Sequence, residues 1–280
     1  MPEGRMSRRQ LMKASAGALL AANVWPGKLA AEDAKTSPLR FVVLNDLHYI
    51  DKGCDDWFEA LMKAVTAEKP DLVFAAGDLT EHGTEAALGA IKEHLAALKC
   101  PVHAIPGNHD WATKTDRAPW QKLFKNSDNF IIKQDTWQFL LLDSTDGLKY
   151  ENVAASKETL AFVADATRQL DKQHPLIVVT HFPVGKGVKY RLTNADELLA
   201  PLKEFNLRYV FGGHYHALTE KKIGDTPVVT NRCCALRRNN HDGSKEKGFF
   251  TCVAMGDGTV KREFVEFKGP AATRPADAKS

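Results

Sequence analysis

Short apolar runs alternate with amphipathic segments along the first three quarters of the chain. The apolar runs predict buried strands, and large apolar residues at three- and four-residue spacing predict helices between them. The predicted helices cover 57–65, 84–99, 156–173 and 194–205, the last with Asn194 as its expected cap. The predicted strands, together with the polar residues that follow them, cover 40–46, 71–78, 101–110, 137–144, 175–183 and 208–216.

The pattern changes towards the end of the chain, where strands follow one another without helices. Segments 226–234, 248–255 and 259–267 predict three strands joined by glycine-containing turns. Alternation followed by consecutive strands favours an α/β fold, in which two sheets form a β-sandwich flanked by helices, as one domain over 38–268. The Pro- and Ala-rich residues 269–280 are expected to form a disordered tail.

The first 31 residues have the layout of an export signal. A basic start precedes a weakly apolar run over 14–24, and a small-residue cleavage site follows at 29–31. The segment SRRQLMK, with the pair Arg8 and Arg9, resembles the twin-arginine leader of bacteria. We therefore expect export to the periplasm by the twin-arginine machinery. No apolar stretch is long enough to predict a permanent membrane span.

The predicted leader carries the excess of positive charge. The whole chain has 38 Lys and Arg against 35 Asp and Glu, and residues 1–31 hold five of the former and one of the latter. The remainder has 33 basic and 34 acidic residues and a net charge of −1. This near-neutral remainder argues against nucleic acid as a partner. The five cysteines show no CxxC spacing, and the sequence assigns no disulfide among them.

Polar clusters follow five of the predicted strands at the point where each strand ends. They read NDLH (45–48), AGDL (76–79), PGNHD (106–110), VTHFP (179–183) and GGHYH (212–216). Because the carboxyl ends of neighbouring strands meet at one crevice, we expect these side chains to lie close together. They are two carboxylates, one amide and five imidazoles, from Asp46, His48, Asp78, Asn108, His109, His181, His214 and His216.

Metal ions would explain this collection of side chains, since buried carboxylates and imidazoles are costly unless they are satisfied. Nitrogen and oxygen ligands without a thiolate suit divalent ions such as Mn, Fe, Zn or Co. Seven ligands are too many for one tetrahedral ion, but they suit two ions that share a carboxylate, an arrangement used in phosphoester hydrolysis. Each motif alone could be an ordinary turn or surface histidine, so the prediction depends on their joint order.

The motif series resembles that of the calcineurin-like metallophosphoesterases. It reads D-x-H at 46–48, G-D at 77–78, G-N-H-D at 107–110, H at 181 and G-H-x-H at 213–216. The resemblance implies the four-layer fold of that family. It also implies hydrolysis of phosphoesters by a hydroxide that bridges two metal ions. A water between two such ions would lose a proton near neutral pH and so supply this hydroxide.

The resemblance further implies a role for each residue. Asp78 would bridge the two ions. His109 would face the substrate phosphate as general acid or charge stabiliser, and Asp110 would orient the His109 ring. One ion would be held by Asp46, His48 and His216, and the other by Asn108, His181 and His214.

Departures from the patterns of particular subfamilies narrow the expected activity. The stretch GDLTEHG (77–83) lacks the arginine of the protein Ser/Thr phosphatases, and Glu81 stands where purple acid phosphatases have a tyrosine ligand. His109 replaces the arginine of the lipid A pathway hydrolases. The full set is most similar to bacterial cyclic-nucleotide phosphodiesterases, which favours phosphodiester hydrolysis. A phosphomonoesterase that scavenges phosphate stays an alternative, and a nuclease or a non-catalytic metal-binding protein is disfavoured.

The small-molecule phosphoester substrate is expected to contact residues close to the metals. Besides Asn108 and His109, the candidates are Asn45 and His82. Arginines at 191, 237 and 238, which lie in less regular segments, could also contact it, but we interpret them as ordinary solvated charges.

Overall fold

The computed structural model describes residues 37–270. The predicted leader, and the predicted tail from residue 271 onwards, lie outside the described residues. Among those that are described, every helix is too short or too polar to span a membrane. The α-helices are α1 (Asp55–Ala67), α2 (Glu85–Ala96), α3 (Ala118–Leu123), α4 (Lys157–Ala166) and α5 (Ala195–Leu199), and short 3-10 turns cover Lys52–Cys54, Asn108–Asp110 and Ala200–Leu202.

The first sheet has five strands in the order β11-β10-β1-β2-β3. Its members are β1 (Leu39–Leu44), β2 (Leu72–Ala76), β3 (Val102–Ile105), β10 (Lys247–Ala254) and β11 (Val260–Phe267). The strands β1, β2 and β3 are parallel, and β10 and β11 continue the sheet antiparallel to their neighbours. The carboxyl ends of the first three strands therefore lie at one edge of this sheet.

The second sheet has six strands in the order β4-β5-β6-β7-β9-β8. They are β4 (Phe130–Gln134), β5 (Trp137–Leu142), β6 (Leu176–Thr180), β7 (Leu207–Gly212), β8 (Thr219–Ile223) and β9 (Thr226–Thr230). The central strands β5, β6, β7 and β9 are parallel, and β4 and β8 form antiparallel edges.

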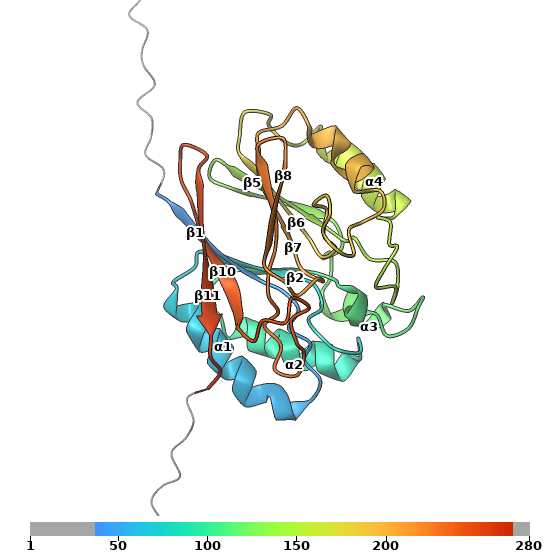
Figure 1. Ribbon diagram of the computed structural model, residues 1–280, viewed down its shortest axis with the longest axis vertical. Coiled ribbons are helices and arrows are strands. Elements are labelled where there is room, and N and C mark those ends of the chain that lie inside the picture. Colours follow the sequence, from blue (N-terminus) through green and yellow to red (C-terminus); the bar gives the residue numbers. More distant parts are fainter. Residues whose placement is uncertain (1–36, 271–280) are drawn as a thin grey trace, which may run out of the picture. The chain divides into compact units, whose positions relative to one another are not determined.

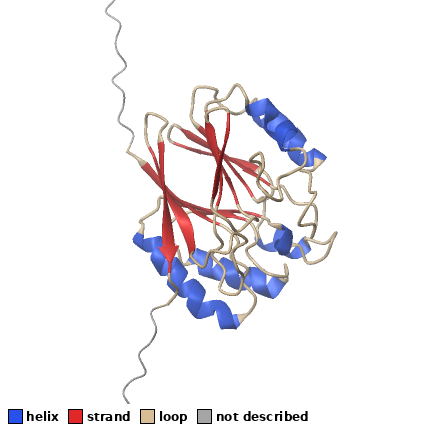
Figure 2. Ribbon diagram, viewed as in Figure 1, coloured by secondary structure: helices blue, strands red, loops and turns tan. Residues whose placement is uncertain are grey.

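The two sheets face each other, with α1 and α2 outside the first sheet and α4 outside the second (Figures 1 and 2). Alternate residues of one strand explain the layers, because Phe41 packs between the sheets whereas Val42 packs towards the helices. In this interior Phe41 meets Phe74 of its own sheet, and Phe139 and Phe211 of the opposite sheet, edge to face. The predicted two-sheet sandwich flanked by helices is confirmed.

Several elements differ from the sequence-based expectation. The strands β4 and β8 and the six-residue helix α3 were not predicted, since they are short and, in β8, mostly charged. The predicted helices 156–173 and 194–205 end early, at Ala166 and Leu199. Asn194 stands at the predicted N-cap position of α5, but its side chain makes no capping hydrogen bond and instead bonds the backbone N–H and carbonyl of Ala155.

Candidate metal centre

The predicted ligands lie on tight turns at the ends of parallel strands from both sheets. Asp46, His48, Asp78, His214 and His216 all adopt positive φ angles between 43° and 62°. Such angles are rare for residues with a side chain, and they cluster where function requires a fixed side-chain direction. The backbone at Gly107 also approaches Asp78 so closely that only glycine fits, since a Cβ there would lie 2.1 Å from the Asp78 carboxylate.

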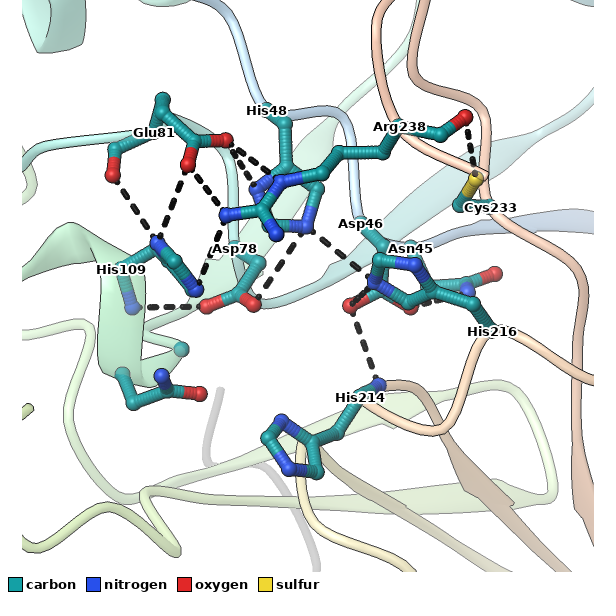
Figure 3. A network of polar contacts seen from close by, with 12 residues as sticks. Asn45, Asp46, His48, Asp78, Glu81, His109, His214, His216, Cys233 and Arg238 are labelled. Carbon is teal, nitrogen blue, oxygen red and sulfur yellow. Dashed lines mark hydrogen bonds and ion pairs between the residues drawn. The ribbon is translucent and has the colours of Figure 1, made fainter. Parts of the chain in front are cut away.

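Four of these side chains form the first candidate group, namely Asp46, His48, Asp78 and His216, all of them buried. Their ligand atoms lie within 4.8 Å of one another. The Nε2 atom of His216 lies 3.3 Å from Asp46 Oδ1, and that of His48 lies 3.6 Å from Asp78 Oδ2. Figure 3 shows these side chains converging from separate loops.

The second candidate group contains Asp78 again, together with His181 and His214. The Nε2 atom of His181 lies 3.4 Å from Asp78 Oδ1 and 3.3 Å from the amide oxygen of Asn108. Asp78 is the only residue common to both groups among the described residues. The fold therefore brings together all seven predicted ligands, and it places one carboxylate between two sets.

The donor atoms of the first group fit a cation. The Nδ1 atoms of His48 and His216 face the Glu81 carboxylate at 3.1 Å and the Asn239 carbonyl at 3.2 Å. The Asn239 carbonyl only accepts, so Nδ1 of His216 carries a proton, and the Glu81 carboxylate favours the same for His48, which directs both Nε2 atoms inward. Despite burial, the Asp46 carboxylate raises the pKa of His216 well above its usual value, so its Nε2 also attracts a proton, which a metal ion would displace. The two Nε2 atoms then face each other at 3.2 Å. Two lone pairs at this distance repel unless a positive charge lies near them, as in histidine metal sites.

The second group fits a cation for the same reason. The Ala76 carbonyl accepts from His181 Nδ1 at 2.9 Å, which directs His181 Nε2 towards the oxygens of Asp78 and Asn108. The Tyr150 carbonyl contacts His214 Nε2 at 2.8 Å, which leaves Nδ1 of that ring as the ligand atom. Oxygen and imidazole donors without a thiolate suit divalent transition ions.

The electrostatics of the centre also favour positive charge. Burial alone would lower the pKa of His181, but the carboxylates of Asp78 and Asp46 outweigh it and raise that pKa to about 9. The pKa of Asp78 lies well below its usual range, since the neighbouring His181 and His109 outweigh burial. The carboxylates thus attract protons to His181 and, in the same way, to His216, whereas burial lowers the pKa of His48 and lowers that of His214 to about 3. Metal ions bind by displacing such protons.

The ring of His109 is held by Glu81. Its Nδ1 atom lies 2.9 Å from the backbone carbonyl of Glu81, and its backbone N–H donates to Asp78 Oδ1 at 2.8 Å. The side chain is 29% exposed, so it borders the pocket rather than the buried ligand groups. Nδ1 is therefore the donor to Glu81, and Nε2 is left to face the pocket.

Asp110 does not orient His109 as the sequence suggested. Its buried carboxylate accepts hydrogen bonds from the backbone N–H groups of Gly107, Leu79 and Thr80 at 2.9, 3.1 and 2.8 Å. The Thr80 hydroxyl is a fourth donor at 3.1 Å. Among residues 37–270 the orienting partner of His109 is the Glu81 carbonyl, and Asp110 instead ties the loop after β3 to the loop after β2.

The remaining predicted substrate contacts divide between the pocket and other places. His82 lines the pocket, whereas the buried Asn45 amide donates to Asp46 Oδ2 at 2.5 Å. Arg191 pairs with Asp196, and Arg237 lies near Asp51. Arg238, which we interpreted as a solvated charge, instead enters the site and pairs with Glu81.

The pocket over the ligands has a volume of about 500 Å³. Besides the predicted residues, it is lined by Glu81 and Arg238, which the sequence did not favour as substrate contacts. Other lining side chains were not singled out from the sequence, namely Trp111, Leu148, Tyr150, Tyr190 and His241. These residues lie in loops without a periodic pattern. Of all these additional lining residues, Glu81 had the clearest signal in the sequence, because it lies only three positions after Asp78.

Comparison with known families agrees with this geometry. A family model for calcineurin-like phosphoesterases matches residues 39–218, which include every predicted metal ligand. The chain belongs to the calcineurin-like phosphoesterase family. It is thus a metal-dependent phosphoric ester hydrolase, as predicted, with clustered His and Asp residues suited to divalent ions.

Curated relatives carry phosphodiesterase names. The chain is similar to the 3',5'-cyclic adenosine monophosphate phosphodiesterase CpdA of Escherichia coli (strain K12), with 26% identity over 194 residues. That match covers 64% of this chain and 70% of CpdA. It is also similar to the probable glycerophosphodiester phosphodiesterase GpdQ of Arcobacter nitrofigilis, with 29% identity over 172 residues, 58% of this chain and 62% of the relative.

Solved structures confirm the fold alone. The purple acid phosphatase PPD1 from yellow lupin seeds matches with a TM-score of 0.58 and 14% identity, over 83% of this chain and 52% of that one. GAP50, described as the anchor in the inner membrane complex of Plasmodium, matches with a TM-score of 0.58 and 17% identity, over 85% and 88% of the two chains.

Proposed function

We propose that this protein hydrolyses phosphodiesters with two divalent metal ions. The observation that carries the proposal is the position of Asp78, which belongs to both ligand groups. Asp46, His48 and His216 would hold one ion, and Asn108, His181 and His214 the other. When bound, such ions neutralise the phosphoryl oxygens and activate water for attack on phosphorus.

His109 would donate a proton to the leaving oxygen. Because the Glu81 carbonyl can only accept, Nδ1 of His109 keeps its proton in both charge states of the ring. Only Nε2 can then exchange a proton with a substrate in the pocket. This fixed orientation is what a general acid requires, since its geometry must match the leaving group before its pKa matters.

The diester class is supported by the relatives and not by the metal ligands. CpdA and GpdQ are both named as phosphodiesterases, one for a cyclic nucleotide and the other for a glycerophosphodiester. Active-site motifs shared across a superfamily are poor guides to substrate. A small phosphodiester is therefore proposed here without a more specific identity.

Export by the twin-arginine pathway forms a separate part of the proposal. Its support is the sequence SRRQLMK followed by an apolar run and a small-residue site within residues 1–31. Fractionation of cells that express the full chain would test it, with Arg8→Lys/Arg9→Lys as the matched variant. Periplasmic wild type and cytoplasmic retention of the variant are expected, and equal distribution of the two would contradict export.

The activity itself is tested by a paired assay with metal analysis. The full chain is loaded with Mn, and hydrolysis of bis-p-nitrophenyl phosphate is compared with that of p-nitrophenyl phosphate, with and without chelator. We expect faster cleavage of the diester, loss of both activities with chelator, and about two ions per chain. Faster cleavage of the monoester would assign the protein to the phosphatases, and cleavage of neither ester would refute a phosphoesterase.

A further inference from the structure

Glu81 connects three parts of the site. Its Oε2 atom lies 3.1 Å from Nδ1 of His48 and accepts from Nε of Arg238 at 2.8 Å. Its Oε1 atom accepts from Nη2 of Arg238, and its backbone carbonyl accepts from His109. The Glu81 side chain is only 13% exposed. Glu81 thus contacts a metal ligand and a guanidinium through its carboxylate, and the proposed acid through its backbone carbonyl, so this one residue is placed to position all three.

Arg238 approaches this centre from the loop that follows β9. Figure 3 shows its guanidinium between Glu81 and His109. Its Nη2 atom lies 3.4 Å from Nε2 of His109, and its side chain lines the pocket with 37% exposed. Because a guanidinium only donates, Nη2 faces an unprotonated Nε2 of His109, and this nitrogen must take up a proton before it can act as the acid.

One end of the guanidinium has no partner within the described part of the chain. Glu81 engages Nε and Nη2 side-on, and no hydrogen bond joins Nη1 to any residue between 37 and 270. A guanidinium has five N–H donors in a rigid plane, and this arrangement leaves the two of Nη1 unused. The pair with Glu81 fixes their direction.

We propose that Arg238 contacts a non-bridging phosphoryl oxygen of the substrate through Nη1, and that Glu81 is the positioning residue that holds it there. The inference rests on the proposed phosphoesterase function and assigns it a further substrate-binding residue. Guanidinium groups are well suited to phosphate oxygens because their planar donors match the geometry of the anion.

The contact has a consequence for specificity. A phosphomonoester carries roughly −1.5 to −2 charges at neutral pH, whereas a diester carries about one. A cation beside the phosphate therefore contributes more to binding of the monoester. The metal ligands alone suit both ester types, and Arg238 adds a contact that favours the monoester. Removal of Arg238 should therefore increase the preference for diesters.

The test measures kcat and KM of Arg238→Ala for both p-nitrophenyl esters at saturating Mn. Loss of a charge-assisted hydrogen bond predicts a roughly 10- to 100-fold lower kcat/KM for the monoester. The loss for the diester should be several-fold smaller, and the metal content should match wild type. Added guanidinium ion should restore part of the monoester activity in this variant, an effect that a purely structural role would not produce.

The adjacent arginine provides a matched control. Arg237 is 48% exposed and lies 3.4 Å from Asp51, and it does not line the pocket. Arg237→Ala should leave both kcat/KM values unchanged. Arg238→Lys keeps the charge but not the planar donors, so it should recover part of the loss without matching wild type.

Glu81→Gln tests the positioning role in a double-mutant cycle. We expect it to lower monoester kcat/KM in the wild-type background and to have little further effect on the ester ratio in the Arg238→Ala background. An unchanged ester ratio in Arg238→Ala, absence of rescue by guanidinium, or loss of bound metal from that variant would overturn the inference. An inactive, metal-loaded wild type would instead refute the proposed function, so the two failures can be distinguished.

Discussion

The two ligand groups that share Asp78 differ in what supports them from outside. In the first group, Nδ1 of His48 faces the Glu81 carboxylate, which in turn binds Arg238 at the pocket. In the second group, the outer nitrogens of His181 and His214 face the backbone carbonyls of Ala76 and Tyr150. One group is thus supported by a charged side chain behind His48 and a backbone carbonyl behind His216, and the other by backbone carbonyls alone.

This difference determines whether a side-chain substitution can change the basicity of the imidazoles in each group. A carboxylate behind an imidazole raises its basicity more than a neutral carbonyl does, and a substitution can remove it. A backbone carbonyl belongs to the fold and persists in every variant. We infer that the first group is electrostatically coupled to the substrate pocket through Glu81, whereas the second is fixed by the ends of β2 and β6 and by the Tyr150 loop.

Loss of the shared Asp78 carboxylate should weaken metal binding at both groups alike, and this is the largest effect that we expect. Asp78→Asn removes the charge common to both, so we expect each ion to bind more than about 100-fold more weakly, beyond the range for outer-sphere changes. Metal analysis after dialysis and the diester assay measure the outcome. Retention of one full equivalent of metal would show that Asp78 does not bridge.

Loss of His109 should affect neither group. His109→Ala removes the proposed proton donor but no ligand, so turnover should fall by roughly 10²–10⁴ with metal content near that of wild type. His94→Ala is the control, because His94 pairs with Asp55 away from the centre. A fall in metal content would make His109 a ligand instead of an acid.

Loss of the Glu81 carboxylate should weaken metal binding at the first group and leave the second group unaffected. Glu81→Gln leaves the backbone carbonyl that holds His109 and removes the charge behind His48. Affinity for the first ion should fall by about 10- to 100-fold, as for other outer-sphere changes, while affinity for the second stays near wild type. Titration of the metal-free protein with Mn, followed by calorimetry, measures both affinities. Equal weakening of the two ions would contradict independent support.

The sequence predicted the ligand groups because each ligand directly follows an apolar strand. Asp46, Asp78 and His181 end runs that are buried on both faces, and parallel strands carry such positions to one edge. The same rule predicted the central strands of both sheets. The edge strands β4 and β8 were missed because an edge needs neither a continuous apolar run nor strict alternation.

The support of the ligands could not be predicted in the same way. Glu81 and Arg238 meet across 157 positions of sequence, and Arg238 lies in an irregular segment after β9. No local pattern marks such a contact. The role expected for Asp110 failed for a related reason, since its adjacency to His109 in sequence says nothing about which way a carboxylate turns inside a 3-10 turn.

The smallest effect on activity is expected from Asp110, whose carboxylate ties two ligand loops together without touching a ligand side chain. Asp110→Asn keeps one oxygen acceptor but turns an NH₂ group towards N–H donors of Gly107, Leu79 and Thr80, leaving at least one of them unsatisfied. An unsatisfied buried donor costs about 1–3 kcal/mol of stability. Chemical unfolding of the metal-free protein should show this loss, with both ions still bound in the loaded protein. Asp110 bonds the backbone beside Asp78, which both groups share, and does not contact any ligand imidazole. A loss of only one ion in this variant would therefore mean that the loops, and not Glu81, distinguish the two groups.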